Sequence, residues 1–141
     1  MNPVVIDANI LFAALMRADT RFGKVILTAQ NDLFYIPRFA IIELFKHKER
    51  IVQLTNCPEV ILLELYYRLL KRLQFMDEDL IAVDSWREAW ELVKDIDEKD
   101  VSYLAMTIEL NARLWTNDME LKNGLKSKGF DHFYQPFSTF P

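Results

Sequence analysis

The chain has 141 residues, 51% of them hydrophobic, so it is long enough to form one domain with a substantial core. Its formal net charge of −4 argues against a general nucleic-acid coat protein, which would be basic, but it does not exclude a nuclease. The single cysteine, Cys57, excludes an intrachain disulfide, and we find no secretory leader or apolar run of membrane-spanning length. We therefore expect one soluble cytoplasmic domain over residues 1–141, without a membrane segment.

The first forty residues predict a strand, helical segments and a second strand. Residues 3–6 form an apolar run that ends at Asp7. The apolar positions of residues 10–16 and the amphipathic pattern of residues 20–29 favour helices. Residues 33–36 predict the second strand, and Pro37 suits the first turn of the helix that follows.

The middle of the chain predicts a long helix from Pro58 to Leu73 that is apolar on more than one side. Such a helix is either buried on two sides, as part of a helical hairpin over the core, or it contacts a partner protein. The sequence leaves both interpretations open. Ile81 to Val83 predict another short strand, and Asp84 is suited to cap a helix from Trp86 to Lys94.

Residues 100–118 predict a helix, a turn and a buried strand with a carboxylate at each end. Apolar residues recur at helical spacing after Asp100, and Asn111 suits the left-handed residue that ends a helix. Leu114 and Trp115 then predict a short buried strand before Asp118. Beyond it we expect a helix over residues 119–128, stopped by Gly129, and an edge strand over residues 132–134.

Alternating strands and helices predict a three-layer α/β/α domain, doubly wound around a mainly parallel sheet. In such sheets the ligand site lies beyond the carboxyl ends of the strands. Asp7 and Asp118 each follow a strand and Asp100 opens a helix. We therefore expect the three side chains to face one crevice.

These residues resemble the PIN domain family, whose best-known members are the VapC-type toxin nucleases. The resemblance covers residues 4 to about 134, and residues 100–118 are its most specific part. The first motif is an apolar strand that ends in Asp7, Ala8 and Asn9, and the second is Glu43 in a downstream helix. The third is Asp100, followed by a helix and by a strand that ends in the Thr-x-Asp pattern of residues 116–118. Two positions depart from the common pattern, because Asn9 stands where many members have Ser or Thr and Asn111 where many have Gly.

Carboxylates that converge repel one another unless a cation bridges them, and hard divalent cations prefer oxygen ligands. The only two histidines, His47 and His132, and the lone cysteine form no cluster, which argues against zinc. The resemblance implies that Mg²⁺ or Mn²⁺ is bound by four acids, which are Asp7, Glu43, Asp100 and Asp118. Asp97 is a fifth candidate ligand. Asn9, Thr116 and Asn117 are expected behind these ligands, where they would orient the carboxylates by hydrogen bonds.

Each acid also has a purely structural interpretation. Asp97, Asp100 and Asp118 occur where helix caps are common, and Glu43 has Lys46 and His47 as helical neighbours with which it can pair. Capping does not exclude metal binding, because a carboxylate at the amino end of a helix already lies near the mouth of the sheet.

The resemblance implies a metal-dependent endoribonuclease that leaves a 5′-phosphate and a 3′-hydroxyl. It favours the toxin of a toxin–antitoxin pair, with an antitoxin as partner, and it implies a homodimer. Three alternatives stay open: a housekeeping RNA-processing nuclease, a non-catalytic binding module of the same fold, and a haloacid-dehalogenase-like phosphatase. The last would need a second Asp two residues after Asp7, where this chain has Asn9.

Overall fold

The protein was studied as a computed structural model that describes residues 1–16, 21–55 and 58–137. Cys57 lies outside the described residues. Within them the strands are β1 (Asn2–Ile6), β2 (Asp32–Pro37), β3 (Leu73–Met76) and β4 (Arg113–Trp115). The α-helices are α1 (Ala8–Met16), α2 (Arg21–Thr28), α3 (Phe39–Lys46), α4 (Lys48–Thr55), α5 (Glu59–Leu70), α6 (Val83–Val93), α7 (Val101–Glu109) and α8 (Met119–Ser127). Two 3-10 turns, η1 (Glu78–Leu80) and η2 (Glu98–Asp100), precede α6 and α7.

The strands form one parallel sheet in the order β3-β2-β1-β4. Val4, Val5 and Ile6 of the central strand are fully buried, as expected for a parallel strand that is covered on both faces. The chain adds β2 and β3 on one side of β1 and then crosses to add β4 on the other side. The reversal of strand order, where ligands bind in such sheets, therefore lies between β1 and β4.

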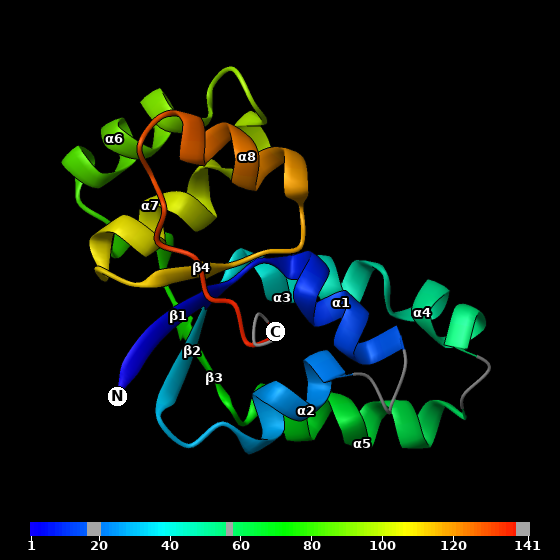
Figure 1. The fold of residues 1–141 in the computed structure, drawn as a ribbon. Helices are drawn as coiled ribbons and strands as arrows, with labels where there is room; N and C mark the ends of the chain where they lie inside the picture. The colour runs from blue at the N-terminus through cyan, green and yellow to red at the C-terminus, as the bar shows by residue number, and fades with distance from the viewer. Residues whose placement is uncertain (17–20, 56–57, 138–141) are drawn as a thin grey trace.

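Helices cover the sheet on two sides, which confirms the three-layer α/β/α arrangement (Figure 1). On one side α7 lies against β1, β2 and β4, with α6 and α8 beside it. On the other side α1, α2 and α5 pack together. In the described part of the chain, no helix has the length and apolar character that crossing a membrane requires.

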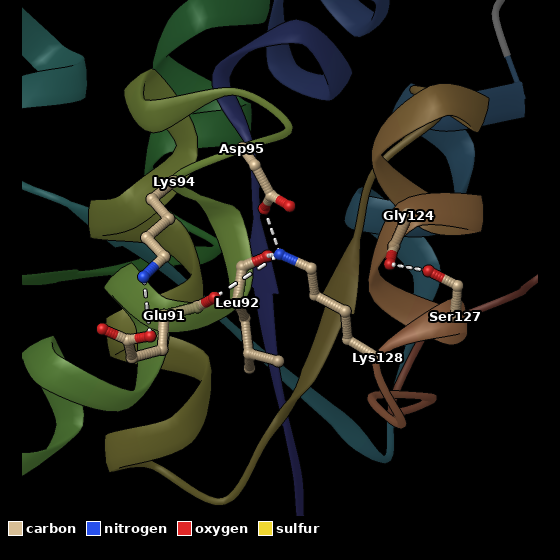
Figure 2. A network of polar contacts seen from close by, with 7 residues as sticks. All are labelled: Glu91, Leu92, Lys94, Asp95, Gly124, Ser127 and Lys128. Carbon is tan, nitrogen blue, oxygen red and sulfur yellow. Dashed lines mark hydrogen bonds and ion pairs between the residues drawn. The ribbon is translucent and has the colours of Figure 1, made fainter.

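A polar network ties the end of α8 to the end of α6, as Figure 2 shows. Lys128 donates to the backbone carbonyls of Glu91 and Leu92 and pairs with the carboxylate of Asp95. The carbonyls at the end of a helix lack partners within that helix, so Lys128 satisfies groups that would otherwise need water. The network fixes α8, whose amino end carries Asp118, against the helices on the same side of the sheet.

Several sequence predictions need correction. The third strand is β3, whereas Ile81 and Ala82 are outside any strand and Val83 begins α6. Asp84 therefore lies inside the first turn of α6, and the residue at its cap position is Ala82. Pro37 is not in a helical turn, because it ends β2 opposite Met76.

Two predicted turn positions are confirmed. Asn111 has φ 49 and Gly129 has φ 93, so each helix before them ends in the left-handed conformation. The predicted edge strand over residues 132–134 is reduced to one parallel bridge between Leu114 and Phe133.

The helix predicted from Pro58 to Leu73 is α5, and it ends at Leu70. Leu62, Tyr66 and Leu69 are its buried side, whereas Val60 is 77% exposed and Tyr67 is 63% exposed. The helix therefore covers α2 with one side and leaves apolar side chains on the other.

Candidate functional site

The site is built around Asp7, which directly follows the central strand. The backbone N–H of Asp7 donates to the carbonyl of Trp115 at 3.2 Å, so the carboxyl ends of β1 and β4 are held together. The carboxylate is 4% exposed and accepts hydrogen bonds from the backbone N–H of Asn9 (2.7 Å) and the hydroxyl of Thr116 (2.8 Å). A longer bond of 3.4 Å comes from the N–H of Ile10. Burial raises the pKa of Asp7 and the charge of Asp118 adds to the rise, while these hydrogen bonds oppose it.

Thr116 joins two of the acids at the end of β4. Its hydroxyl donates to Asp7 and accepts from the backbone N–H of Asp118 at 3.1 Å. The side chain of Thr116 is 2% exposed, so both bonds are shielded from water. Thr116 therefore holds Asp7 and orients the start of α8. Its predicted role behind a metal ligand stays a prediction.

Asp118 caps α8. Its Oδ1 atom accepts from the backbone N–H of Leu121 at 3.1 Å, so the capping interpretation is realised. Its Oδ2 atom has no hydrogen bond with any other described residue. The carboxylate is half-buried and raises the pKa of both Asp7 and Asp100. Capping uses one oxygen and leaves the other for a ligand.

Asp100 occupies the cap position of α7, but its side chain accepts no capping hydrogen bond from the backbone. The carboxyl is half-buried, and burial raises its pKa from 3.8 to about 7, with the charges of Asp7, Asp97 and Asp118 adding to the rise. An acid with this pKa holds a proton much of the time at neutral pH unless a cation replaces it. Asp7, Asp100 and Asp118 therefore form one electrostatically coupled group at the point where the strand order reverses.

Asp97 and Glu43 differ in how they act on this group. The charge of Asp97 raises the pKa of Asp100, but it is not among the charges that act on Asp7. Asp97 is exposed and caps η2 by accepting from the N–H of Lys99 at 3.0 Å. On α3, the carboxylate oxygens of Glu43 lie 3.7 Å from Nζ of Lys46 and 3.7 Å from Nε2 of His47. These are the local pairs that the sequence suggested for Glu43. Glu43 raises the pKa of Tyr103 but is not among the charges that act on Asp7 or Asp100.

Tyr103 is a site residue that the sequence did not reveal. It lies one turn after Asp100 on α7, is 7% exposed, and its hydroxyl is hydrogen-bonded to the backbone of Ala8. Burial raises its pKa well above the usual range, and the charges of Asp7, Asp100 and Glu43 add to the rise. In the sequence Tyr103 looks like an ordinary core residue at an inward helical position, and only the fold brings it close enough for Asp7 and Glu43 to act on it.

The remaining predicted supporting residues are on the surface. Asn9 is exposed and contributes its backbone N–H, rather than a side-chain bond, to Asp7. Asn117 is exposed and makes no hydrogen bond with another residue that the structure describes. Asn9 borders a cavity of about 420 Å³ between α1 and α4, and Asn117 borders one of about 270 Å³ beside β4.

The donor chemistry of the acids fits a hard divalent cation. Among the described residues, no group of three or more His, Cys, Asp or Glu side chains is placed to hold a metal ion by itself. Mg²⁺ typically keeps several waters and binds one or two carboxylates directly. An arrangement of one or two direct ligands, with the other acids reached through water, is therefore the one that these residues can provide.

A family model described as "PIN domain" matches residues 5–137. Among solved structures, one similar chain comes from VapBC2 of Rickettsia felis, bound to a DNA fragment from their promoter. The two chains are 19% identical with a TM-score of 0.61, over 86% of this chain and 92% of that one. At this identity the likeness shows a shared fold. The comparison with curated proteins gave no match.

Proposed function

The chain belongs to the PIN domain family, and from that membership and the coupled acids we propose that it is an endoribonuclease that uses Mg²⁺ or Mn²⁺ to hydrolyse RNA phosphodiester bonds. The observation that carries the proposal is the group of Asp7, Asp100 and Asp118 at the carboxyl ends of β1 and β4. Burial and mutual repulsion raise the pKa of Asp100 to about 7, which is an unfavourable arrangement for a domain that needs acids only as caps.

One or two of Asp7, Asp100 and Asp118 would bind the ion directly, and the rest of the three would bind it through water. Glu43 would also act through water, or after a rotation that breaks its pairs with Lys46 and His47. A bound divalent ion supplies a water of lowered pKa and neutralises charge on the phosphate. The chain's own part is positional: Thr116 and the backbone N–H of Asn9 fix the plane of the Asp7 carboxylate. The products would carry a 5′-phosphate and a 3′-hydroxyl. Single-stranded or looped RNA is the favoured form, because an unstacked backbone can bend into the crevice.

We further propose that the enzyme is the toxin of a toxin–antitoxin pair and forms a homodimer in the cytoplasm. Support for the pairing is the fold shared with a chain of VapBC2. Support for self-association is the apolar outer side of α5, where Val60, Ile61 and Tyr67 are exposed. A gene neighbour that encodes a small DNA-binding protein would favour the toxin role, and its absence would favour a housekeeping RNA-processing enzyme.

The test is RNA cleavage by purified protein with Mn²⁺, with excess EDTA, and by Asp100→Asn. We expect the wild type to cut RNA in Mn²⁺ and not in EDTA, and to leave 5′-phosphate ends on the products. Asp100→Asn in Mn²⁺ should lose most of the wild-type rate. Wild-type protein without cleavage in Mn²⁺ would instead support a non-catalytic binding module. Cleavage by Asp100→Asn at the wild-type rate, in a preparation free of other nucleases, would reject this site.

A further inference from the structure

A cavity of about 270 Å³ lies directly beside the acids, at the end of β4. Its volume is just below the roughly 300 Å³ at which pockets for small organic ligands begin, so it suits a single flat ring. Segments that are far apart in the sequence form its wall. The aromatic and basic residues of this wall are Arg21, Phe22, Trp115, Lys122, Tyr134 and Phe137.

Aromatic rings make up much of this wall. Phe22 and Phe137 meet edge to face with centroids 5.5 Å apart, and Trp115 meets Tyr134 in the same way at 5.2 Å. Phe22 also contacts Trp115 at 6.1 Å, so the rings form one continuous cluster. Trp115 is buried, whereas Phe22, Tyr134 and Phe137 are only half-buried and retain surface toward the cavity. Such rings can stack on any base, because every base has a π face.

The same wall carries positive charge. The guanidinium carbon of Arg21 lies 4.4 Å from the centroid of the Phe137 ring. Lys122 of α8 also lines the cavity, and its ammonium lies 5.8 Å from the centroid of the Phe133 ring. Neither side chain forms an ion pair with another residue in the described ranges. In a chain with a net charge of −4, two cations that have no ion pair among the described residues and lie beside aromatic rings mark a place where phosphate and base can be held together.

The cavity and the acids share Thr116. Its hydroxyl bonds Asp7, while the residue itself lines the cavity together with Asn117. A strand whose phosphate lies at the acids would therefore place a neighbouring nucleotide at the cavity.

We propose that this cavity binds one unpaired base of single-stranded RNA next to the bond that is cut, with Arg21 and Lys122 on the flanking phosphate. The choice of RNA rests on the proposed function. The aromatic wall holds the base by stacking, and the two cations fix the direction in which the strand enters the site.

The test measures binding apart from cleavage. A fluorescein-labelled single-stranded RNA of ten nucleotides with mixed sequence is titrated at several salt concentrations in EDTA, and cleavage is assayed separately in Mn²⁺. Phe137→Leu keeps an apolar side chain but removes the ring, and Arg21→Ala removes the charge. Lys24→Ala is the matched control, because it removes one exposed charge from the same helix at a residue that does not line the cavity. Thermal melts verify that each variant is folded.

Phe137→Leu should weaken binding by about 5-fold to 150-fold, the range measured for the loss of one base–aromatic stack. Its dependence on salt should not change. Arg21→Ala should also weaken binding and lower the slope of log affinity against log salt by about 0.7, the value for one phosphate contact on a single strand. Lys24→Ala should bind within about 2-fold of wild type.

Wild-type affinity in both cavity variants would overturn this proposal, and it would leave the proposed function intact if the wild type cuts RNA in Mn²⁺. Wild-type protein that neither binds nor cuts RNA would overturn both. The predicted losses in a wild type that binds but does not cut would support the cavity and reject the nuclease.

Discussion

Replacing Asp100 by Asn should stabilise the metal-free protein at neutral and alkaline pH. Burial and the charges of Asp7, Asp97 and Asp118 raise the pKa of Asp100 from 3.8 to about 7 in the folded chain. Ionising Asp100 therefore costs folded-state stability, and the cost grows as the pH rises from about 4 to about 7. Fully expressed, the difference would be about 4 kcal/mol above pH 7. Because Asp100 is only half-buried, water screens the repulsion, and we expect about 1–2 kcal/mol.

Thermal melts in EDTA at pH 4 and pH 8 measure this effect. For a chain of 141 residues, 1–2 kcal/mol corresponds to a rise in Tm of about 3–8 °C. The variant should exceed the wild type by this amount at pH 8 and by little or nothing at pH 4. Asp84→Asn, at a fully solvated position on α6, is the control and should change stability by less than about 0.5 kcal/mol. An Asp100→Asn variant that is less stable than wild type at pH 8, or equally shifted at both pH values, would refute the reasoning.

Asp118→Asn should leave the stability of the metal-free protein equal or higher, because Asn still caps α8, and it should reduce the rise in Tm on adding Mn²⁺. A less stable metal-free variant with an unchanged Mn²⁺ response would remove Asp118 from the site. Thr116→Ala should lower the free energy of unfolding by about 1–3 kcal/mol and slow RNA cleavage. Thr116→Ser keeps the hydroxyl and should restore both. A Ser variant as impaired as the Ala variant would show that the methyl group matters instead. Tyr67→Glu, at an exposed position on α5, should shift sedimentation toward monomer in a protein that melts like wild type, and an unchanged sedimentation profile would place the dimer contact elsewhere.

Local signals in the sequence were sufficient to predict the strands and helices that carry Asp7, Asp100 and Asp118. Each of these acids follows a short apolar run or opens a periodic helix, and Asn111 marks the turn between α7 and β4. The doubly wound arrangement then brings the three together, because parallel strands end at one edge of the sheet.

Non-local packing explains what the sequence did not show. The strand β3 follows the apolar α5 after only two intervening residues, and its assignment depends on pairing with β2. Ile81 is buried without being in a strand, so apolar character alone suggested the wrong element. The cavity beside Thr116 was equally invisible, since residues from both ends of the chain line it.

The most direct test of the central claim is a calorimetric titration of Mn²⁺ into wild-type protein and into Asp7→Asn at pH 6.5, in buffers with different ionisation enthalpies. If Asp7, Asp100 and Asp118 hold the ion, Mn²⁺ should bind the wild type and release up to about one proton, because the pKa of Asp100 is about 7 before binding. Asp7→Asn should bind at least about 10-fold more weakly. Equal affinities in the two proteins, or binding without proton release, would contradict the account.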